Sequence, residues 1–196
     1  MKASALKLVI VDRDGTINVQ SDDFIKSADE WMPLPGAMEA IAQLNHAGWH
    51  VVVVSNQSGL GRGLFDVAAL NAMHTKLHKQ LAVVGGRIDA IFYCPHSPEE
   101  KCNCRKPLPG LFEQIGERYG VDLKQVPTVG DNLRDLQAGV AAGCEPHLVL
   151  TGKGAQHRGQ TLPPEYPAGT WIHEDLAAFV RFILEREVRA PVALAV

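Results

Sequence analysis

Two aspartates lie one residue apart directly after an apolar run, in the stretch 9–16. The apolar run predicts a buried strand, and ligands in open α/β sheets bind just outside the carboxyl ends of such strands. Side chains two residues apart in an extended segment point to the same side. Asp12 and Asp14 could therefore hold a divalent cation, attack an electrophile, or do both. Asp-Gly is also a common turn pair, so these residues alone leave a simple acidic turn open.

A second pair of carboxylates, Asp131 and Asp135, follows another predicted strand at a strand-to-helix junction. Asp131 could complete a magnesium site begun by Asp12, because Mg²⁺ prefers a few hard oxygen ligands and keeps several waters. Asp135 could support that site or, as an acidic residue in the first helical turn, stabilise the helix that follows.

Three cysteines and a histidine follow the spacing C-x-H-x5-C-x-C: Cys94, His96, Cys102 and Cys104. Three thiolates and one imidazole form a closed tetrahedral zinc set, which leaves no open position for catalysis. The spacing predicts a structural zinc ion that fixes the loop 94–106, with unrelated cysteines or one disulfide as the alternative. Such a cluster is typical of a reducing compartment.

Groups that could bind an anion follow the zinc ligands and another predicted strand. Arg105 and Lys106 come directly after Cys104; arginine grips phosphate oxygens with two donors and lysine acts as a point charge, although such pairs often form only solvated surface. A donor-rich stretch begins at Ser55, which could bind phosphate with neighbouring amides. Its other candidate substrate-binding residues are Asn56, Gln57, Ser58 and Arg62. The glycines here lack the spacing of a dinucleotide loop, and no helix is expected to begin immediately.

Alternating strands and helices must position these residues. Apolar runs predict strands at 6–11, 49–54, 88–93, 126–129 and 147–150; helical spacing and end signals predict helices at 35–47, 66–81, 109–119, 133–142 and 175–188. The connections are long enough for parallel pairing. We predict a doubly wound, mostly parallel α/β sheet in one domain over 1–196. A flap at 19–33 should cover the strand ends, and the tail 190–196 should be loose.

Composition argues against several classes of protein. The formal net charge is -3 and only 6% of residues are aromatic, which disfavours a general nucleic-acid or anionic-membrane binder. No apolar stretch approaches the ~18 residues of a membrane span, and no small-residue cleavage site follows the N-terminus. We expect a cytoplasmic monomer. His74 and His78, spaced i and i+4, are predicted to lie on a solvated helix face, and Gly152-Lys153-Gly154 lacks the upstream spacing of a phosphate-binding P-loop.

The arrangement of motifs is similar to that of a known family. The motif residues are Asp12-Arg13-Asp14-Gly15-Thr16, Ser55, Lys106 and Gly130-Asp131 with Asp135. They resemble the four motifs of the haloacid dehalogenase superfamily of phosphohydrolases. The C-x-H-x5-C-x-C loop resembles that of its heptose bisphosphate and histidinol-phosphate phosphatases. The resemblance covers about residues 6–152 and implies a Rossmann-like fold without a cap domain, acting on a small, phosphorylated, sugar-like substrate.

The resemblance also implies a mechanism, in which a phosphomonoester is hydrolysed through an aspartyl-phosphate with Mg²⁺ as cofactor. Asp12 would attack phosphorus, and an ordinary carboxyl pKa near ~4 would leave it ionised. Asp14 would protonate the leaving alkoxide and then deprotonate water. Asp12, Asp131 and the backbone carbonyl of Asp14 would hold Mg²⁺. Ser55 and Lys106 would neutralise the transferring phosphoryl group.

The function expected from this resemblance is removal of the 7-phosphate of D-glycero-D-manno-heptose 1,7-bisphosphate, a step towards nucleotide-activated heptose for lipopolysaccharide. The same chemistry on histidinol phosphate is the nearest alternative. A zinc-stabilised binding module without enzymatic activity would leave the polar strand ends unexplained, and a nucleotide kinase would need a P-loop.

Overall fold

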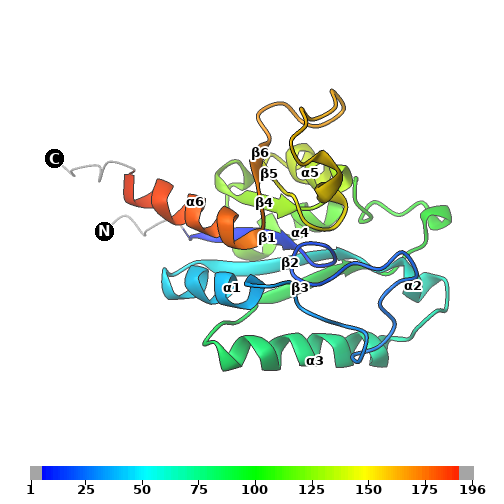
Figure 1. Ribbon diagram of the computed structural model, residues 1–196. Coiled ribbons are helices and arrows are strands. Elements are labelled where there is room, and N and C mark those ends of the chain that lie inside the picture. Colours follow the sequence, from blue (N-terminus) through cyan, green and yellow to red (C-terminus); the bar gives the residue numbers. More distant parts are fainter. Residues whose placement is uncertain (1–5, 190–196) are drawn as a thin grey trace.

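The computed structural model describes residues 6–189, so the predicted loose tail at 190–196 lies outside the described residues. Six strands form one sheet in the order β3-β2-β1-β4-β5-β6, and every neighbouring pair is parallel (Figure 1). The strands are β1 (Leu8–Asp12), β2 (His50–Asn56), β3 (Ala90–Cys94), β4 (Pro127–Gly130), β5 (Glu145–Val149) and β6 (Trp171–His173). The helices are α1 (Ala37–His46), α2 (Ser58–Gly61), α3 (Val67–Val83), α4 (Gly110–Tyr119), α5 (Leu133–Ala141) and α6 (Leu176–Arg189), with short 3₁₀ turns η1 (Pro98–Glu100), η2 (Leu123–Gln125) and η3 (Gly152–His157).

The chain winds outwards from β1 in both directions. It runs through β2 and β3 on one side, then returns to β4 beside β1 and continues to β5 and β6. The carboxyl ends of β1 and β4 therefore flank the point where the strand order reverses, which is where ligands bind in open α/β sheets. The predicted doubly wound parallel sheet is confirmed.

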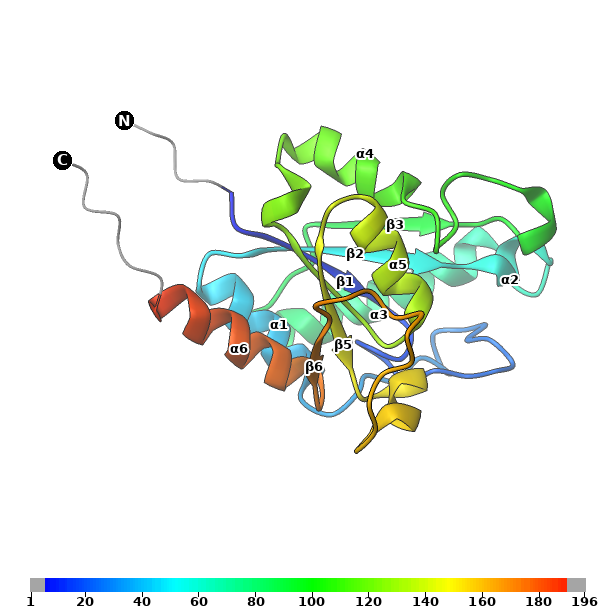
Figure 2. The same ribbon diagram turned by 90° about the horizontal axis from the view of Figure 1, so that it is seen from above.

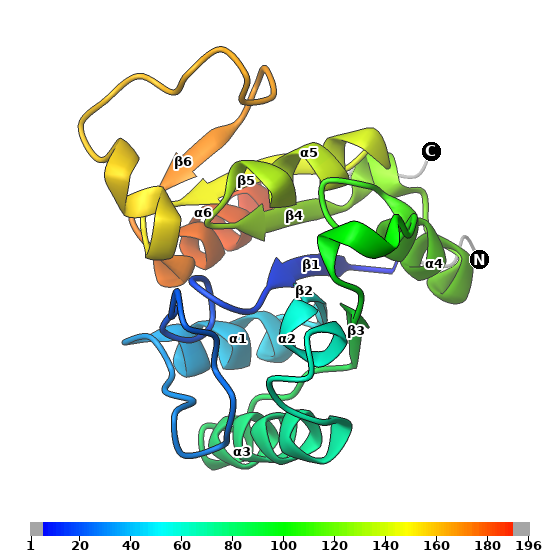
Figure 3. The same ribbon diagram turned by 90° about the vertical axis from the view of Figure 1, so that its right-hand side faces the viewer.

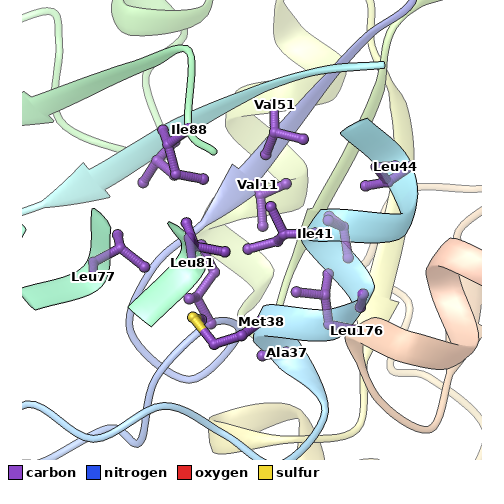
Figure 4. Close-up of a cluster of buried hydrophobic side chains, with 14 of the residues drawn as sticks. Val11, Ala37, Met38, Ile41, Leu44, Val51, Leu77, Leu81, Ile88 and Leu176 are labelled. Atoms are coloured by element: carbon purple, nitrogen blue, oxygen red, sulfur yellow. The ribbon is translucent and has the colours of Figure 1, made fainter. Parts of the chain in front are cut away.

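Alternating side chains of the central strands pack on opposite faces of the sheet. Val9 and Val11 belong to a core with α1, α3 and α6, whereas Leu8 and Ile10 belong to a second core with α4 and α5. Figure 4 shows the first core, in which Val11 and Val51 of the sheet face Ile41 of α1. Because both faces are covered, β1 and β2 read as continuous apolar runs in the sequence.

Three segments far apart in the chain gather at the carboxyl edge of β1 to β3: the predicted flap, α2 and the loop after β3 (Figures 2 and 3). The flap is tied to α3, because the Lys76 ammonium of that helix donates to the carbonyl oxygens of Ala28 and Trp31 at 2.7 Å each. Trp31 itself is fully buried. The base of the flap is therefore part of the core, and the flap's exposed residues include Val19, those at 21–23, Asp29 and Glu30.

Local signals account for most element ends, and two elements were not expected. The Asp66 carboxylate caps α3 by accepting from the Ala69 amide at 2.8 Å, and Gly120 ends α4 in the left-handed conformation. The expectation that no helix begins at once after Ser55 is wrong, because α2 forms one turn from Ser58. The strand β6 was not predicted. No helix within 6–189 has the length and apolarity needed to span a membrane.

Candidate active site

Lys106 is the buried positive charge at the centre of the site. Its ammonium donates to Asp12 Oδ1 at 2.5 Å and to the Val54 carbonyl oxygen at 3.0 Å, and it pairs with Asp135 Oδ1 at 2.7 Å. Burial opposes the charge, but Asp12 and Asp135 more than compensate, so the pKa of Lys106 is raised. The structure thus brings together residues from β1, the loop after β3 and α5, as the sequence predicted.

Three carboxylates meet beside this lysine. Asp12, Asp131 and Asp135 are all buried, and each offers an oxygen within 4.8 Å of the others. Burial and the charge of Asp135 raise the pKa of Asp12 to about 7, although Lys106 lowers it; burial and Asp12 raise the pKa of Asp131 to about 8. The expected ordinary pKa of Asp12 is therefore wrong for the metal-free site. A divalent cation fits this oxygen set, because it would offset the excess negative charge.

The Asp14 carboxylate is not part of this trio and is held by four other side chains. Arg13 donates to it with two nitrogens, at 2.9 Å for the closest contact, and Asn18 and Gln57 donate at 2.9 Å each. The Ser55 hydroxyl lies 3.4 Å away. Burial raises the pKa of Asp14, but these donors, led by Arg13, outweigh burial and lower it. The carboxylate is therefore fixed by these donors and ionised in the free protein.

The donor-rich residues at the carboxyl end of β2 and just beyond it make different contacts. Gln57 donates to Ser55 Oγ at 2.5 Å as well as to Asp14. Asn56 exchanges two hydrogen bonds with the backbone of Lys106, at 3.0 and 3.1 Å, and so fixes the loop that carries the lysine. Ser58 begins α2. Ser55, near the end of β2, lines a small cavity that is also lined by Asp12.

The predicted metal-binding loop is formed as expected. The Sγ atom of Cys94 lies 3.5 Å from His96 Nδ1 and 3.6 Å from Cys102 Sγ, and Cys104 Sγ lies 3.3 Å from the same nitrogen. A tetrahedral zinc ion with bonds of about 2.3 Å to sulfur and 2.0–2.1 Å to nitrogen separates its ligands by about 3.5–3.8 Å. Burial raises the pKa of Cys94 to about 12, so a thiolate there needs a cation. The cluster can hold a metal ion.

Two adjoining cavities connect the carboxylates with solvent. An inner chamber of about 90 Å³ is lined by Asp12, Asp131, Lys106 and Ser55, among others. An outer cavity of about 390 Å³ shares Asp14, Gln20, Asn56 and Arg134 with it and is lined by five basic residues but only two acidic ones. The basic residues are Arg13, Arg62, Arg105, Arg134 and Lys153, and the acidic ones are Asp14 and Asp22. A larger cavity of about 840 Å³ lies between α2, the start of α3 and His96, and none of the catalytic candidates lines it.

Sequence reasoning missed several residues of these cavities. Arg134 lies close enough to Arg105 that, together with burial, it lowers the pKa of the Arg105 guanidinium. Gln20 and Phe24 reach the outer cavity from the flap, and Phe24 has a positive φ of 64°, which is uncommon for an aromatic residue. A basic residue in the first turn of α5, against the helix dipole, was a signal that could have identified Arg134.

The two histidines noted in the sequence line neither the inner nor the outer cavity. His78 is exposed, but the expectation of a solvated position is wrong for His74, which packs against Tyr93 with ring centroids 6.3 Å apart. Burial, followed by the charge of Arg13, lowers the pKa of His74 to about 4. Cys144 is buried in the core beneath α4.

Comparison with known proteins identifies the family. A family model described as HAD-hydrolase-like matches residues 103–179. The D-glycero-beta-D-manno-heptose-1,7-bisphosphate 7-phosphatase of Bordetella bronchiseptica is 56% identical over 180 residues, covering 92% of this chain and 99% of the relative. The protein of that name from Pseudomonas aeruginosa is 52% identical over 178 residues, covering 91% and 98%.

A solved structure agrees with these relatives. The crystal structure of D,D-heptose 1,7-bisphosphate phosphatase from B. bronchiseptica, complexed with magnesium and phosphate, matches with a TM-score of 0.88 and 55% identity, covering 92% of this chain and 99% of that one. The parallel sheet with buried carboxylates and a lysine at its reversal point, together with these relatives, places the chain among the hydrolases of phosphate esters. The chain belongs to the haloacid dehalogenase-like phosphatases, in the family of the heptose-1,7-bisphosphate 7-phosphatases.

Proposed function

We propose that this protein is a Mg²⁺-dependent phosphatase that removes the 7-phosphate of D-glycero-D-manno-heptose 1,7-bisphosphate through an aspartyl-phosphate. The observation that carries the proposal is the pair of adjoining cavities, one lined by the buried carboxylates and Lys106 and the other by basic side chains. The names of the relatives support the same substrate.

Asp12 and Asp14 take different roles in this proposal because their surroundings differ. Asp12 Oδ1 contacts the Lys106 ammonium inside the inner chamber, where the carboxylate can attack phosphorus. Asp14 lies at the junction with the outer cavity, where it can protonate the leaving alkoxide and then deprotonate water. The donors that hold Asp14 ionised in the free protein favour its role as a base. Binding of an anionic substrate among the same donors weakens their effect on its pKa and so favours protonation.

Lys106 and Ser55 neutralise the phosphoryl group, and Asp135 holds Lys106 in place through its 2.7 Å ion pair. Asp135 also accepts from the Asn132 amide at 3.1 Å, which fixes it at the start of α5. Mg²⁺, held by Asp12, Asp131 and the Asp14 carbonyl, would supply positive charge that keeps the carboxylates ionised and offsets charge on the phosphoryl oxygens.

The outer cavity supports a substrate that carries a second anionic group. Arg62, Arg105, Arg134 and Lys153 line it together with buried Arg13, whose charge is paired with Asp14. The second phosphate of a heptose bisphosphate would be bound by several of these cations. Histidinol phosphate carries an ammonium group at this end, which the same cations would repel. The cavity therefore favours the bisphosphate over histidinol phosphate.

The Cys/His cluster is proposed to hold zinc with a structural role. All four ligands come from the protein, so the ion has no open position. The loop ends at Arg105 and Lys106, and the Arg105 guanidinium donates to the His96 carbonyl at 3.4 Å. Fixing the loop therefore positions two residues of the site. No disulfide joins the four cysteines, which supports the predicted cytoplasmic location, and the monomeric state stays a prediction.

The proposed function is tested by measuring phosphate release from the heptose bisphosphate by wild type and by Asp12→Asn. Magnesium is removed by dialysis, because a strong chelator would also strip the Cys/His cluster. Wild type should need Mg²⁺, and the Asn variant should lose activity by at least ~10³-fold while keeping its melting temperature. Asp29→Asn, an exposed aspartate of the flap, is the matched control and should retain activity. Turnover by Asp12→Asn near the wild-type rate would refute the proposed nucleophile.

A further inference from the structure

The turn that follows β5 packs directly on Asp131, the proposed metal ligand that comes directly after β4. We propose that this turn, Thr151–Gly154, together with Gln20 of the flap, is a positioning device that presents Asp131 to the cation in one orientation. The inference rests on the proposed function, since it concerns the same metal site. It assigns a role to the Gly152-Lys153-Gly154 motif, whose spacing does not fit a phosphate-binding loop.

Protein donors occupy one oxygen of the Asp131 carboxylate. The backbone amide of Lys153 donates to Asp131 Oδ2 at 2.7 Å. With its amide oriented to satisfy both ends, Gln20 donates to the same oxygen at 3.0 Å and accepts from the Lys153 ammonium at 3.3 Å. Because Oδ2 is saturated in this way, Oδ1 is the oxygen left for a cation. Outer hydrogen bonds of this kind orient metal ligands.

Two glycines allow the turn to approach this closely. A Cβ atom on Gly152 would overlap Asp131 Oδ2 and would lie 2.7 Å from the Cα of Gly15, and a Cβ on Gly15 would overlap the same oxygen. Gly152 also has a φ of 48°, in the left-handed region. The carboxylate is therefore enclosed between two backbone segments, and no larger residue fits at either position without displacing it.

The turn is itself tied to the loop that carries the catalytic aspartates. The Thr151 hydroxyl donates to the Gly15 carbonyl oxygen at 2.6 Å. A Cβ on Gly154 would overlap the Val149 carbonyl and lie 3.2 Å from the Asp131 carbonyl, so this glycine allows the chain to fold back over β4 and β5. The turn thus couples the position of Asp131 to that of the residues after β1, and Gln20 adds the flap to the same arrangement.

The proposal predicts that the Lys153 backbone amide, rather than its side chain, sets the affinity for Mg²⁺. Lys153→Pro removes the amide hydrogen, whereas Lys153→Ala keeps it. Proline is tolerated near the start of a helical turn, where η3 places this residue. Loss of outer-shell partners costs about 10–100-fold in metal affinity. We expect Lys153→Pro to weaken Mg²⁺ binding by about 10-fold or more and Lys153→Ala by less than about 3-fold.

Mg²⁺ affinity is measured without substrate, by calorimetric titration and by the rise in melting temperature with Mg²⁺ concentration. Gln20→Ala tests the same claim without changing the backbone and should weaken binding by about 3–10-fold. A role in stability alone would lower the melting temperature of each variant and leave its Mg²⁺ dissociation constant unchanged. That result, or equal Mg²⁺ affinity for the Pro and Ala variants together with wild-type affinity for Gln20→Ala, would overturn the inference. Failure of wild type itself to bind Mg²⁺ would instead contradict the proposed function.

Discussion

Replacing Asp131 with asparagine should stabilise the metal-free protein while removing its response to Mg²⁺. Asp131 is 3% exposed and lies beside two further carboxylates, so burial and Asp12 raise its pKa from 3.8 to about 8. A rise of about four units corresponds to an upper limit of about 6 kcal/mol. Because the charges of Asp12 and Lys106 respond to the substitution, we expect Asp131→Asn to raise the free energy of unfolding by only about 3 kcal/mol. This corresponds to a rise of about 6–12 °C in melting temperature.

The pH dependence follows from the direction of the pKa shift. A carboxyl group whose pKa is higher in the folded than in the unfolded state takes up a proton on folding between pH ~4 and ~8. Its contribution to the free energy of unfolding is therefore fully present below pH ~4 and is lost as the pH rises through ~8. Metal-free wild type should lose stability over this range, and Asp131→Asn should lose less.

The assay is urea and thermal denaturation at pH 5 and pH 8, in magnesium-free buffer without chelator and then with saturating Mg²⁺. Asp29→Asn, an exposed site with the same change of charge, is the control. Wild type should gain stability from Mg²⁺ mainly at pH 8, and Asp131→Asn should not gain it. The reasoning is refuted if Asp131→Asn is no more stable than the control at pH 8 without metal.

Three further predictions concern other parts of the molecule. Removing zinc with a thiol-reactive reagent, or Cys102→Ser, should lower the melting temperature by about 10 °C or more and reduce bound zinc, whereas magnesium removal should lower it much less; equal effects would contradict a structural zinc. Arg134→Ala should raise KM for the bisphosphate about 3–10-fold, with little change for a monophosphate, and Arg181→Ala should change neither; equal effects on both substrates would exclude Arg134 from binding the second phosphate. Burial lowers the pKa of His173 to about 4, and its ring nitrogen lies 2.9 Å from that of His147. In saturating Mg²⁺ the free energy of unfolding should therefore fall by about 2 kcal/mol as the pH falls from ~6.5 to ~4, and it should fall less in His173→Gln. An equal pH dependence of the free energy of unfolding in both proteins would contradict an origin in His173.

The sequence was most informative where local patterns coincide with burial. The strands β1 and β2 are covered on both faces, so their apolar runs identified them, and Asp66 and Gly120 marked helix ends. The strand β6 escaped prediction because it has three residues at the sheet edge, where Trp171 and Ile172 are each nearly half exposed. The helix α2 escaped because two of its four residues are glycines, which are poor helix formers, and tertiary packing decides its conformation.

The candidate site was likewise predictable only in part. Its charged residues at strand ends were predictable, because parallel strands bring their carboxyl ends to one edge. The environment of each group was not. The raised pKa of Asp12 depends on its burial and then on Asp135, which lies far away in the sequence. The lowered pKa of Asp14 depends on the way the buried Arg13 folds back on its neighbour and outweighs burial with the other donors. The contacts of Gln20 and Lys153 with Asp131 likewise arise only when the flap and the turn after β5 meet.

The proposed function specifies both the substrate, a heptose bisphosphate, and the phosphate that is removed from it. The most direct measurement is turnover of D-glycero-D-manno-heptose 1,7-bisphosphate and histidinol phosphate side by side in Mg²⁺, with the sugar product identified by phosphorus NMR. The account predicts a kcat/KM at least ~10²-fold higher for the bisphosphate, with the C7 phosphate released and the C1 phosphate retained. Comparable or higher kcat/KM for histidinol phosphate, or loss of the C1 phosphate, would contradict it.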